Sequence, residues 1–166
     1  MKTITRIETY NASPQKVFKH LDDLGVTGMH MTKSSAMMMG SKLHLEYLTV
    51  NHTGLRSKYR WTGTMMGMKM DFTVEVTNWI DGIEKTWETI GPARMIIYSW
   101  YRMHLLVTPK ENKSIAELSI SYEKPKGWFS RIISCLFADW YCNWCLKNML
   151  SDSKRKIESE NKTISG

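Results

Sequence analysis

The sequence predicts a single α+β domain in which an antiparallel sheet of about six or seven strands packs against one long C-terminal helix. Three observations support this fold class. The chain has 166 residues, a length that suits one compact domain. Its middle part alternates apolar and polar residues, as half-buried strands do. Its last part places apolar residues three or four positions apart, which is the spacing of a helix that packs with one face on a sheet.

The first elements are a strand and two short helical segments. Residues 2–10 are rich in Thr, Ile and Tyr, which favour strands. Ser13 followed by Pro14 is a helix start signal, because the serine oxygen can accept an unpaired backbone N–H and proline fits the first turn. Residues 17–21 give this helix an apolar face. Residues 25–40 have no clean period, and we interpret them as a second short helix or a mobile loop.

From residue 41 the apolar residues recur at every second position. The segment 68–77 shows the strictest alternation, and Gly91-Pro92 ends a later strand around Trp87. The long apolar segment 95–107 is also a strand, but its pattern does not show which face points inward. The sequence therefore predicts strands at 43–47, 56–61, 68–77, 84–90, 95–107 and 116–122.

The C-terminal part is helical in pattern. A helix from about residue 128 to 159 would span about 45 Å, so it must lie across the sheet. The whole chain, residues 1–166, is then one domain that ends in a flexible tail from about residue 160.

This order of elements resembles the helix-grip fold of the SRPBCC superfamily, which includes START-like, pollen-allergen-like and polyketide cyclase proteins. The resemblance rests on the opening strand with residues 11–18 (NASPQKVF), on the strand meander that ends at 116–123, and on residues 145–150 (CLKNML) of the final helix. It covers nearly the whole chain. It implies a curved sheet that wraps around the long helix, and an internal cavity that binds a hydrophobic small molecule or lipid. It implies no particular reaction, since one fold hosts many functions.

Methionine is the unusual component of the sequence. The chain has 13 methionines, nine of them between Met29 and Met70. Flexible methionines can line an adaptable cavity, although they also fill gaps in ordinary cores. Combined with strand parity, the implied cavity gives these candidate ligand-binding residues: Met37, Met38, Tyr47, Tyr59, Trp61, Met70, Phe72, Trp87, Tyr101 and Trp144.

A cyclase or hydratase that acts on a hydrophobic substrate is the alternative function. Such an enzyme needs a buried acid or base. His44, Asp71 and Glu75 lie on the polar side of their strands and are expected to face solvent. His104, in the strand of open parity, is the weak catalytic candidate that remains. The chain has no motif for a nucleotide or a catalytic nucleophile, so no cofactor is expected.

The cysteines and one methionine-histidine motif are weak metal candidates. Met29-His30-Met31 offers soft ligands but shows no further ligand converging on it. Cys142 and Cys145 form one C-x-x-C pair, whereas a zinc site typically needs two. We expect no metal site. Three cysteines, no signal peptide and no membrane-spanning apolar run together predict a cytoplasmic protein.

The net charge of +7 permits contact with an acidic partner. Lys124, Lys126 and Arg131 surround Trp128 and Phe129, so a second alternative is a protein or membrane interaction module that makes transient contact with anionic lipid. The other basic row, at 56–60, has no aromatic residue on its own face, so nucleic acid is not expected. The sequence does not indicate an oligomeric state.

Overall fold

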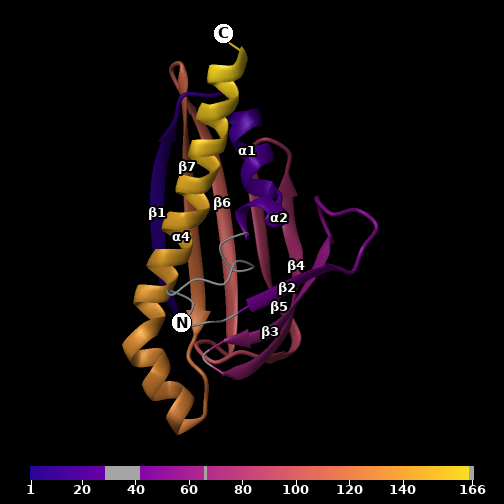
Figure 1. The fold of residues 1–166 in the computed structure, drawn as a ribbon, viewed down its shortest axis with the longest axis vertical. Coiled ribbons are helices and arrows are strands. Elements are labelled where there is room, and N and C mark those ends of the chain that lie inside the picture. The colour runs from indigo at the N-terminus through magenta and orange to yellow at the C-terminus, as the bar shows by residue number, and fades with distance from the viewer. Residues whose placement is uncertain (29–41, 66, 165–166) are drawn as a thin grey trace.

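A computed structural model describes residues 1–28, 42–65 and 67–164. Within these residues, seven antiparallel strands form one sheet in the order β1-β7-β6-β5-β4-β3-β2 (Figure 1). The expected α+β architecture is confirmed. The elements are β1 (Lys2–Tyr10), α1 (Pro14–Asp22), α2 (Leu24–Thr27), β2 (Lys42–Tyr47), β3 (Lys58–Met65), β4 (Met68–Ile80), β5 (Glu84–Arg94), β6 (Trp100–Lys110), β7 (Lys113–Glu123) and α4 (Trp128–Ile164).

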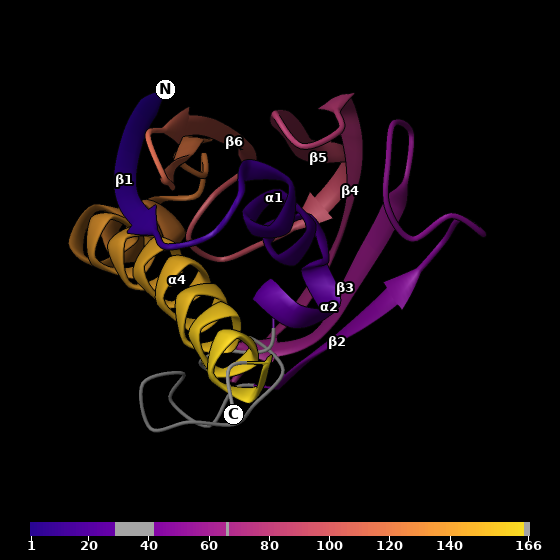
Figure 2. The ribbon, with the colours of Figure 1, turned by 90° about the horizontal axis from the view of Figure 1, so that it is seen from above.

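The sheet is curved and has helices on one side. Seen from above, the strands follow an arc, with α1 and α2 inside the arc and α4 along its open side (Figure 2). The first strand pairs with the last and forms one edge of the sheet. The paired residues run from Lys2 opposite Tyr122 to Tyr10 opposite Ser114. The concave face of the sheet and the helices therefore enclose the hydrophobic core.

Helix α1 begins as the sequence predicts. The Ser13 side chain caps it and accepts a hydrogen bond from the Lys16 backbone N–H at 3.4 Å, and Pro14 occupies the first turn. Val17, Phe18 and Leu21 are buried on its inner face. This face attaches the helix to the concave side of the sheet.

Strand parity decides which residues enter the core. In β4, Phe72, Val74 and Val76 are buried, as the strict alternation predicts. In β6 the buried residues are at odd-numbered positions from Tyr101 to Val107. This settles the parity that the sequence left open, and it places His104 on the opposite, outer face.

Several predicted strand boundaries were wrong, among them that of β3, which is Lys58–Met65 and not 56–61. Strand β5 does not end at Gly91-Pro92 but continues to Arg94. Its pairing with β6 stops at Glu88, so Pro92 lies where one side of the strand has no partner and its missing N–H costs no ladder bond. Strand β6 begins at Trp100, not at Met95, and the intervening residues form a loop that buries Ile96, Ile97 and Tyr98.

Helix α4 has 37 residues and a length of about 55 Å. The helix runs as far as Ile164 and so includes the first residues of the segment from about residue 160 that the sequence predicts to be a flexible tail. Lys16 of α1 holds this end, because its Nζ donates to Asn161 Oδ1 at 2.7 Å and lies 3.3 Å from a Glu160 carboxylate oxygen. At the other end, the first turns of α4 extend past the strands (Figure 1). No helix of the described chain is long and apolar enough to cross a membrane.

Candidate ligand-binding cavity

The core contains an apolar cavity of about 60 Å³ between the concave face of the sheet and α4. Strands β2, β3, β4, β6 and β7, the loop before β6 and the middle of α4 all contribute to its wall. The lining residues are Leu43, Met65, Met70, Phe72, Met95, Ile97, Tyr98, Tyr101, Met103, Ile120, Tyr141, Cys145 and Met149.

The cavity is small, but its walls are adaptable. Pockets for small molecules typically have volumes of about 300–1,000 Å³, so a ligand requires lining side chains to move. Five of the lining residues are methionines, whose unbranched side chains change rotamer at low cost. A ligand larger than the empty space would therefore have to displace methionine side chains of the wall.

Three tyrosines supply the hydroxyl groups of the lining. The Tyr98 hydroxyl lies 3.3 Å from Cys142 Sγ, and Tyr141 hydrogen-bonds to the Cys145 thiol. Burial raises the pKa values of Tyr98, Tyr101 and Tyr141 above the ordinary phenol value. These phenols stay neutral at physiological pH, so they can orient a polar atom of a ligand but are poor proton donors or bases.

The described lining contains no Asp, Glu, His, Lys or Arg. His104, the weak catalytic candidate, lies on the outer face of the sheet and is half-buried there, with its Nε2 3.0 Å from Glu84 Oε1. His44 is exposed. The cavity therefore offers apolar contact and hydroxyl groups, and His104 cannot act in it.

Comparison with known proteins identifies the fold. No protein-family model and no curated protein sequence matches the chain. Among solved structures, the protein TTHA0849 from Thermus thermophilus has a TM-score of 0.70 and 16% identity, over 96% of this chain and 99% of that chain. The Zhui aromatase/cyclase from Streptomyces sp. R1128 has a TM-score of 0.66 and 10% identity, over 94% and 95%. Norcoclaurine synthase from Thalictrum flavum, in complex with dopamine and hydroxybenzaldehyde, has a TM-score of 0.63 and 14% identity, over 95% and 87%.

The chain has the helix-grip fold that these solved structures share. The resemblance found in the sequence is thus confirmed for the fold. At these sequence identities, similarity to a helix-grip protein does not show which reaction, if any, or which ligand this chain has.

Three of the residues predicted from the sequence line the helix-grip cavity: Met70, Phe72 and Tyr101. Tyr59, Trp61 and Trp87 are buried in the core but do not line the cavity, and Tyr47 and Trp144 are only partly buried. Met37 and Met38, like the Met29-His30-Met31 motif, lie outside the described residues.

Three of the aromatic residues that miss the cavity lie near the short helices: Tyr59, Trp61 and Trp87. Tyr59 and Trp87 flank the Lys85 ammonium group, which pairs with Asp22 at the end of α1. Trp61 packs against Gly28, where a Cβ atom would come within 2.8 Å of the indole ring. The helices α1 and α2 therefore cover this half of the concave face, and α4 covers the half that holds the cavity.

The sequence reasoning missed the helical side of the cavity. Tyr141, Cys145 and Met149 are spaced four residues apart on α4 and face the sheet together. This spacing is a readable signal, because residues four apart lie on one face of a helix. Tyr98 and Ile97 could not be found this way, since they enter the cavity from an irregular loop.

A buried lysine was also missed. Lys85 shares the inner parity of β5 with Trp87, and its side chain is 0% exposed. Its Nζ lies 2.6 Å from Asp22 Oδ1 and donates to the Asp22 carbonyl at 2.7 Å. Burial lowers the pKa of Lys85, and the charge of Asp22 opposes that shift. The pair lies outside the cavity and ties the end of α1 to the sheet.

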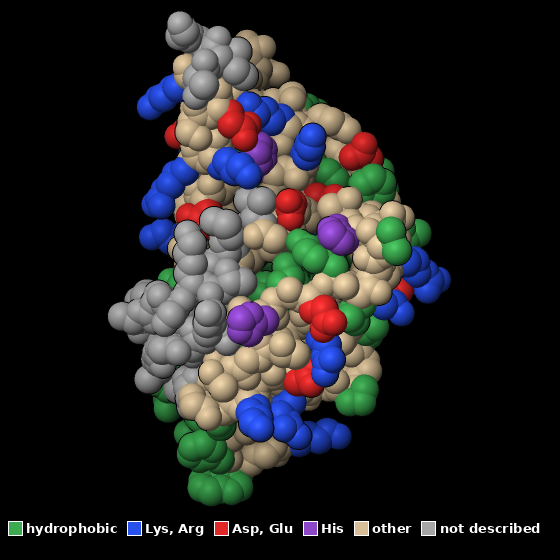
Figure 3. Space-filling view, turned by 45° about the vertical axis from the view of Figure 1, so that its right-hand side comes forward, with side chains coloured by type: hydrophobic (Ala, Val, Ile, Leu, Met, Phe, Trp, Pro, Cys, Tyr) green, Lys and Arg blue, Asp and Glu red, His purple; other side chains and the backbone are tan. Residues whose placement is uncertain are grey.

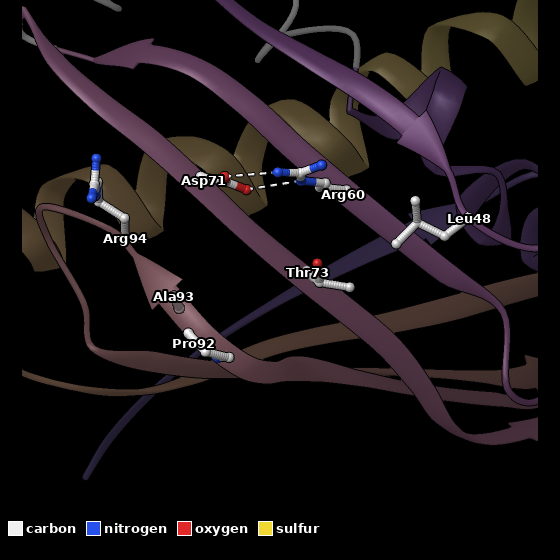
Figure 4. A pocket seen from close by; sticks show the side chains of 7 residues that line it. All are labelled: Leu48, Arg60, Asp71, Thr73, Pro92, Ala93 and Arg94. Carbon is white, nitrogen blue, oxygen red and sulfur yellow. Dashed lines mark hydrogen bonds and ion pairs between the residues drawn. The ribbon is translucent and has the colours of Figure 1, made fainter.

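A surface groove of about 680 Å³ lies on the outer face of the sheet (Figure 4). Two of its charged groups, Arg60 and Asp71, form an ion pair with each other. Arg60 donates to the two Asp71 carboxylate oxygens at 3.0 and 2.9 Å, and it lowers the pKa of that carboxyl. Arg94 points away from this pair (Figure 4). The groove is open and its lining mixes charged with apolar residues, so the internal cavity is the stronger candidate for a hydrophobic ligand.

The three cysteines differ in accessibility. Cys135 is exposed, whereas Cys142 and Cys145 are buried. Burial raises the pKa of Cys142 to about 11 and also raises that of Cys145, which disfavours the reactive thiolate. Among residues 1–28, 42–65 and 67–164, no three His, Cys, Asp or Glu side chains gather as a metal site would require.

These differences predict selective labelling of the native protein. A thiol-reactive reagent near neutral pH is expected to modify Cys135 alone, and Cys142 and Cys145 are expected to react only in denaturant. Intact-mass measurement followed by peptide mapping would locate the label. The Cys135→Ser variant should stay unlabelled when folded. Rapid modification of Cys145 in the native state would instead mean that the cavity wall opens readily.

Proposed function

We propose that this protein binds a neutral hydrophobic small molecule or lipid in the cavity between the sheet and α4, and thereby carries or sequesters it. The observation that carries the proposal is the chemistry of the lining. Its apolar side chains include five methionines, and its oxygen-bearing side chains are three neutral tyrosines. Transfer of apolar ligand surface from water into such a site is favourable by about 25 cal/mol per Å² before ordering costs.

The lining also limits the kind of ligand. A charged group would have no counter-charge among the described lining residues, and an unpaired buried charge is costly. One or two hydroxyl or carbonyl oxygens could instead pair with tyrosine hydroxyls. A largely apolar ring system or isoprenoid with few oxygens suits these groups best.

Two helix-grip neighbours support a small-molecule site in this fold. Norcoclaurine synthase was solved with dopamine and hydroxybenzaldehyde, and the Zhui protein is an aromatase/cyclase. A cyclase- or hydratase-type reaction is the alternative for this chain. The described lining supplies no group that titrates near neutral pH, so binding is the better-supported function.

The first test is native mass spectrometry of the protein purified from its own host. A bound neutral compound is expected, and denaturing extraction would identify it. Purified protein that is empty, and that also binds no member of a lipid and metabolite panel, would contradict the proposal.

A second test asks whether binding takes place in the cavity. It titrates the protein and its cavity variants with a hydrophobic fluorescent probe. Cys145→Met adds bulk to the cavity wall, and the affinity for the probe is expected to fall about tenfold or more, since 1.4 kcal/mol of overpacking is a factor of ten. Ile120→Phe, from the opposite wall, should act likewise. Cys135→Met makes the same chemical change at an exposed position of the same helix and should leave the affinity unchanged. Equal affinities in all variants would place the bound probe elsewhere.

A further inference from the structure

The first half of α4 carries an exposed apolar face. Thirteen large hydrophobic residues are exposed in the described chain, and six of them lie between residues 128 and 140. Their exposed fractions range from 42% for Phe137 to 77% for Trp128. We call this set the α4 face: Trp128, Phe129, Ile132, Leu136, Phe137 and Trp140.

Helical spacing makes these residues one continuous surface. Trp128, Ile132, Leu136 and Trp140 follow each other at intervals of four, which places them in a row along one side of the helix. The other side packs inward, where Ser134 and Ala138 are buried. Hydrophobic side chains are also visible at the end of the molecule where α4 begins (Figure 3). A monomer rarely exposes so extended an apolar surface without a partner.

The charges around the α4 face favour an anionic partner. Lys124, Lys126, Arg131 and Lys147 are exposed beside it, and none of them forms an ion pair with a described residue. Asp139 is the single acidic residue from 124 to 147, and Lys2 neutralises it. The segment therefore has a net charge of +3, from four basic residues and one acidic residue.

The same charges disfavour a second copy of the chain as the partner. A two-fold contact would bring this basic rim against itself, and Asp139, the single acidic residue of the segment, is already paired with Lys2. A bilayer surface that contains acidic lipids meets both needs. Apolar side chains can insert below its headgroups, and tryptophan side chains favour its interface with water. Its negative charge attracts lysine and arginine.

We propose that the α4 face docks the protein on membranes that contain anionic lipid. The helix lies in the plane of the interface with Trp128, Leu136 and Trp140 inserted among the lipids. Because the first turns of α4 extend past the strands, the helix reaches the surface without obstruction from the sheet (Figure 1). This inference does not depend on the proposed ligand, because the docking residues do not line the cavity.

The test is cosedimentation of the full-length protein with vesicles of phosphatidylcholine alone or with about one third phosphatidylserine. Retention is expected on the acidic vesicles only, and it should weaken as salt is added, because the attraction is electrostatic. The Trp128→Ala/Leu136→Ala double variant is expected to lose at least tenfold in vesicle affinity. Lys126→Gln/Arg131→Gln should weaken binding to acidic vesicles in the same direction.

The matched control is Val50→Ala/Leu55→Ala, which removes two exposed apolar side chains from the loop between β2 and β3. Its vesicle binding should equal that of the unmodified protein. Circular dichroism checks that each variant is folded. Absence of retention on acidic vesicles, or retention that Trp128→Ala/Leu136→Ala leaves unchanged, overturns the proposal. Analytical ultracentrifugation tests whether a second copy of the chain binds the α4 face instead. A dimer that Trp128→Ala/Leu136→Ala dissociates, together with no vesicle binding, would assign the face to that second copy.

Discussion

Lys85→Ala is expected to lower the free energy of unfolding by about 3–5 kcal/mol, because it leaves the buried carboxylate of Asp22 without its counter-charge. Lys85 also donates to the Asp22 carbonyl and lies 5.2 Å from the Trp87 ring centroid, so the variant loses these contacts as well. Urea unfolding followed by circular dichroism would measure the change.

The control for this prediction is an ion pair whose cation is exposed. Arg56, whose side chain is 83% exposed, lies 3.5 Å from a Glu75 carboxylate oxygen. Arg56→Ala should therefore cost no more than about 1 kcal/mol. The double variant Asp22→Leu/Lys85→Met replaces both charges with apolar side chains, and it should lose less stability than the sum of Asp22→Leu and Lys85→Met alone. Additive losses would show that the two charges do not stabilise each other.

Alkaline pH is expected to unfold the protein cooperatively. The pKa values of Tyr98, Tyr101 and Tyr141 are raised in the folded state by burial. Their contribution to stability is fully present below the unfolded pKa of about 10 and is lost as the pH rises toward the folded values. Each such group lowers the free energy of unfolding by up to about 1.4 kcal/mol per pH unit, so the three together give about 4 kcal/mol per unit. Since domains are stable by only about 5–15 kcal/mol, unfolding should follow within about two to three units above pH 10.

Tyrosinate absorbance and far-ultraviolet circular dichroism on the same samples would test this expectation. The two signals should change together, since the buried phenols ionise only when the chain unfolds. Tyr101→Phe should reduce the pH dependence by about 1.4 kcal/mol per unit, whereas Tyr47→Phe, at a half-exposed position, should reduce it less. Ionisation of all tyrosines near pH 10 with the circular dichroism unchanged would contradict the assigned burial.

Sequence periodicity was sufficient to predict the fold, because the buried residues of single strands and helices follow the expected spacing. In β4, every inward residue from Met70 to Val76 is apolar and every residue between them is polar. Ser13-Pro14 marks the start of α1 by its own chemistry. Pro92 misled the prediction, because only the pairing of neighbouring strands shows that β5 has a free side there.

The candidate site was less predictable, because parity gives the inner face of a strand but not which helix covers it. Phe72 and Tyr59 are both buried on the concave face, yet only Phe72 reaches the cavity. The difference depends on where α1 and α4 lie over the sheet, which is tertiary information. Lys85 is the extreme case, since its partner Asp22 is 63 residues earlier in the chain.

The pairing of β1 with β7 also sets the order in which the protein can be completed during synthesis. Residues 2–10 are made first, but their hydrogen-bonding partners are residues 114–122. Until that later segment leaves the ribosome, the hairpins from β2 to β6 can form while β1 remains without its neighbour. Such distant pairing slows folding, because a long loop must close before its contacts are gained. The nascent chain therefore exposes the edge of β6 and the inner face of the sheet until its last third emerges, and this interval is when it is most prone to aggregation.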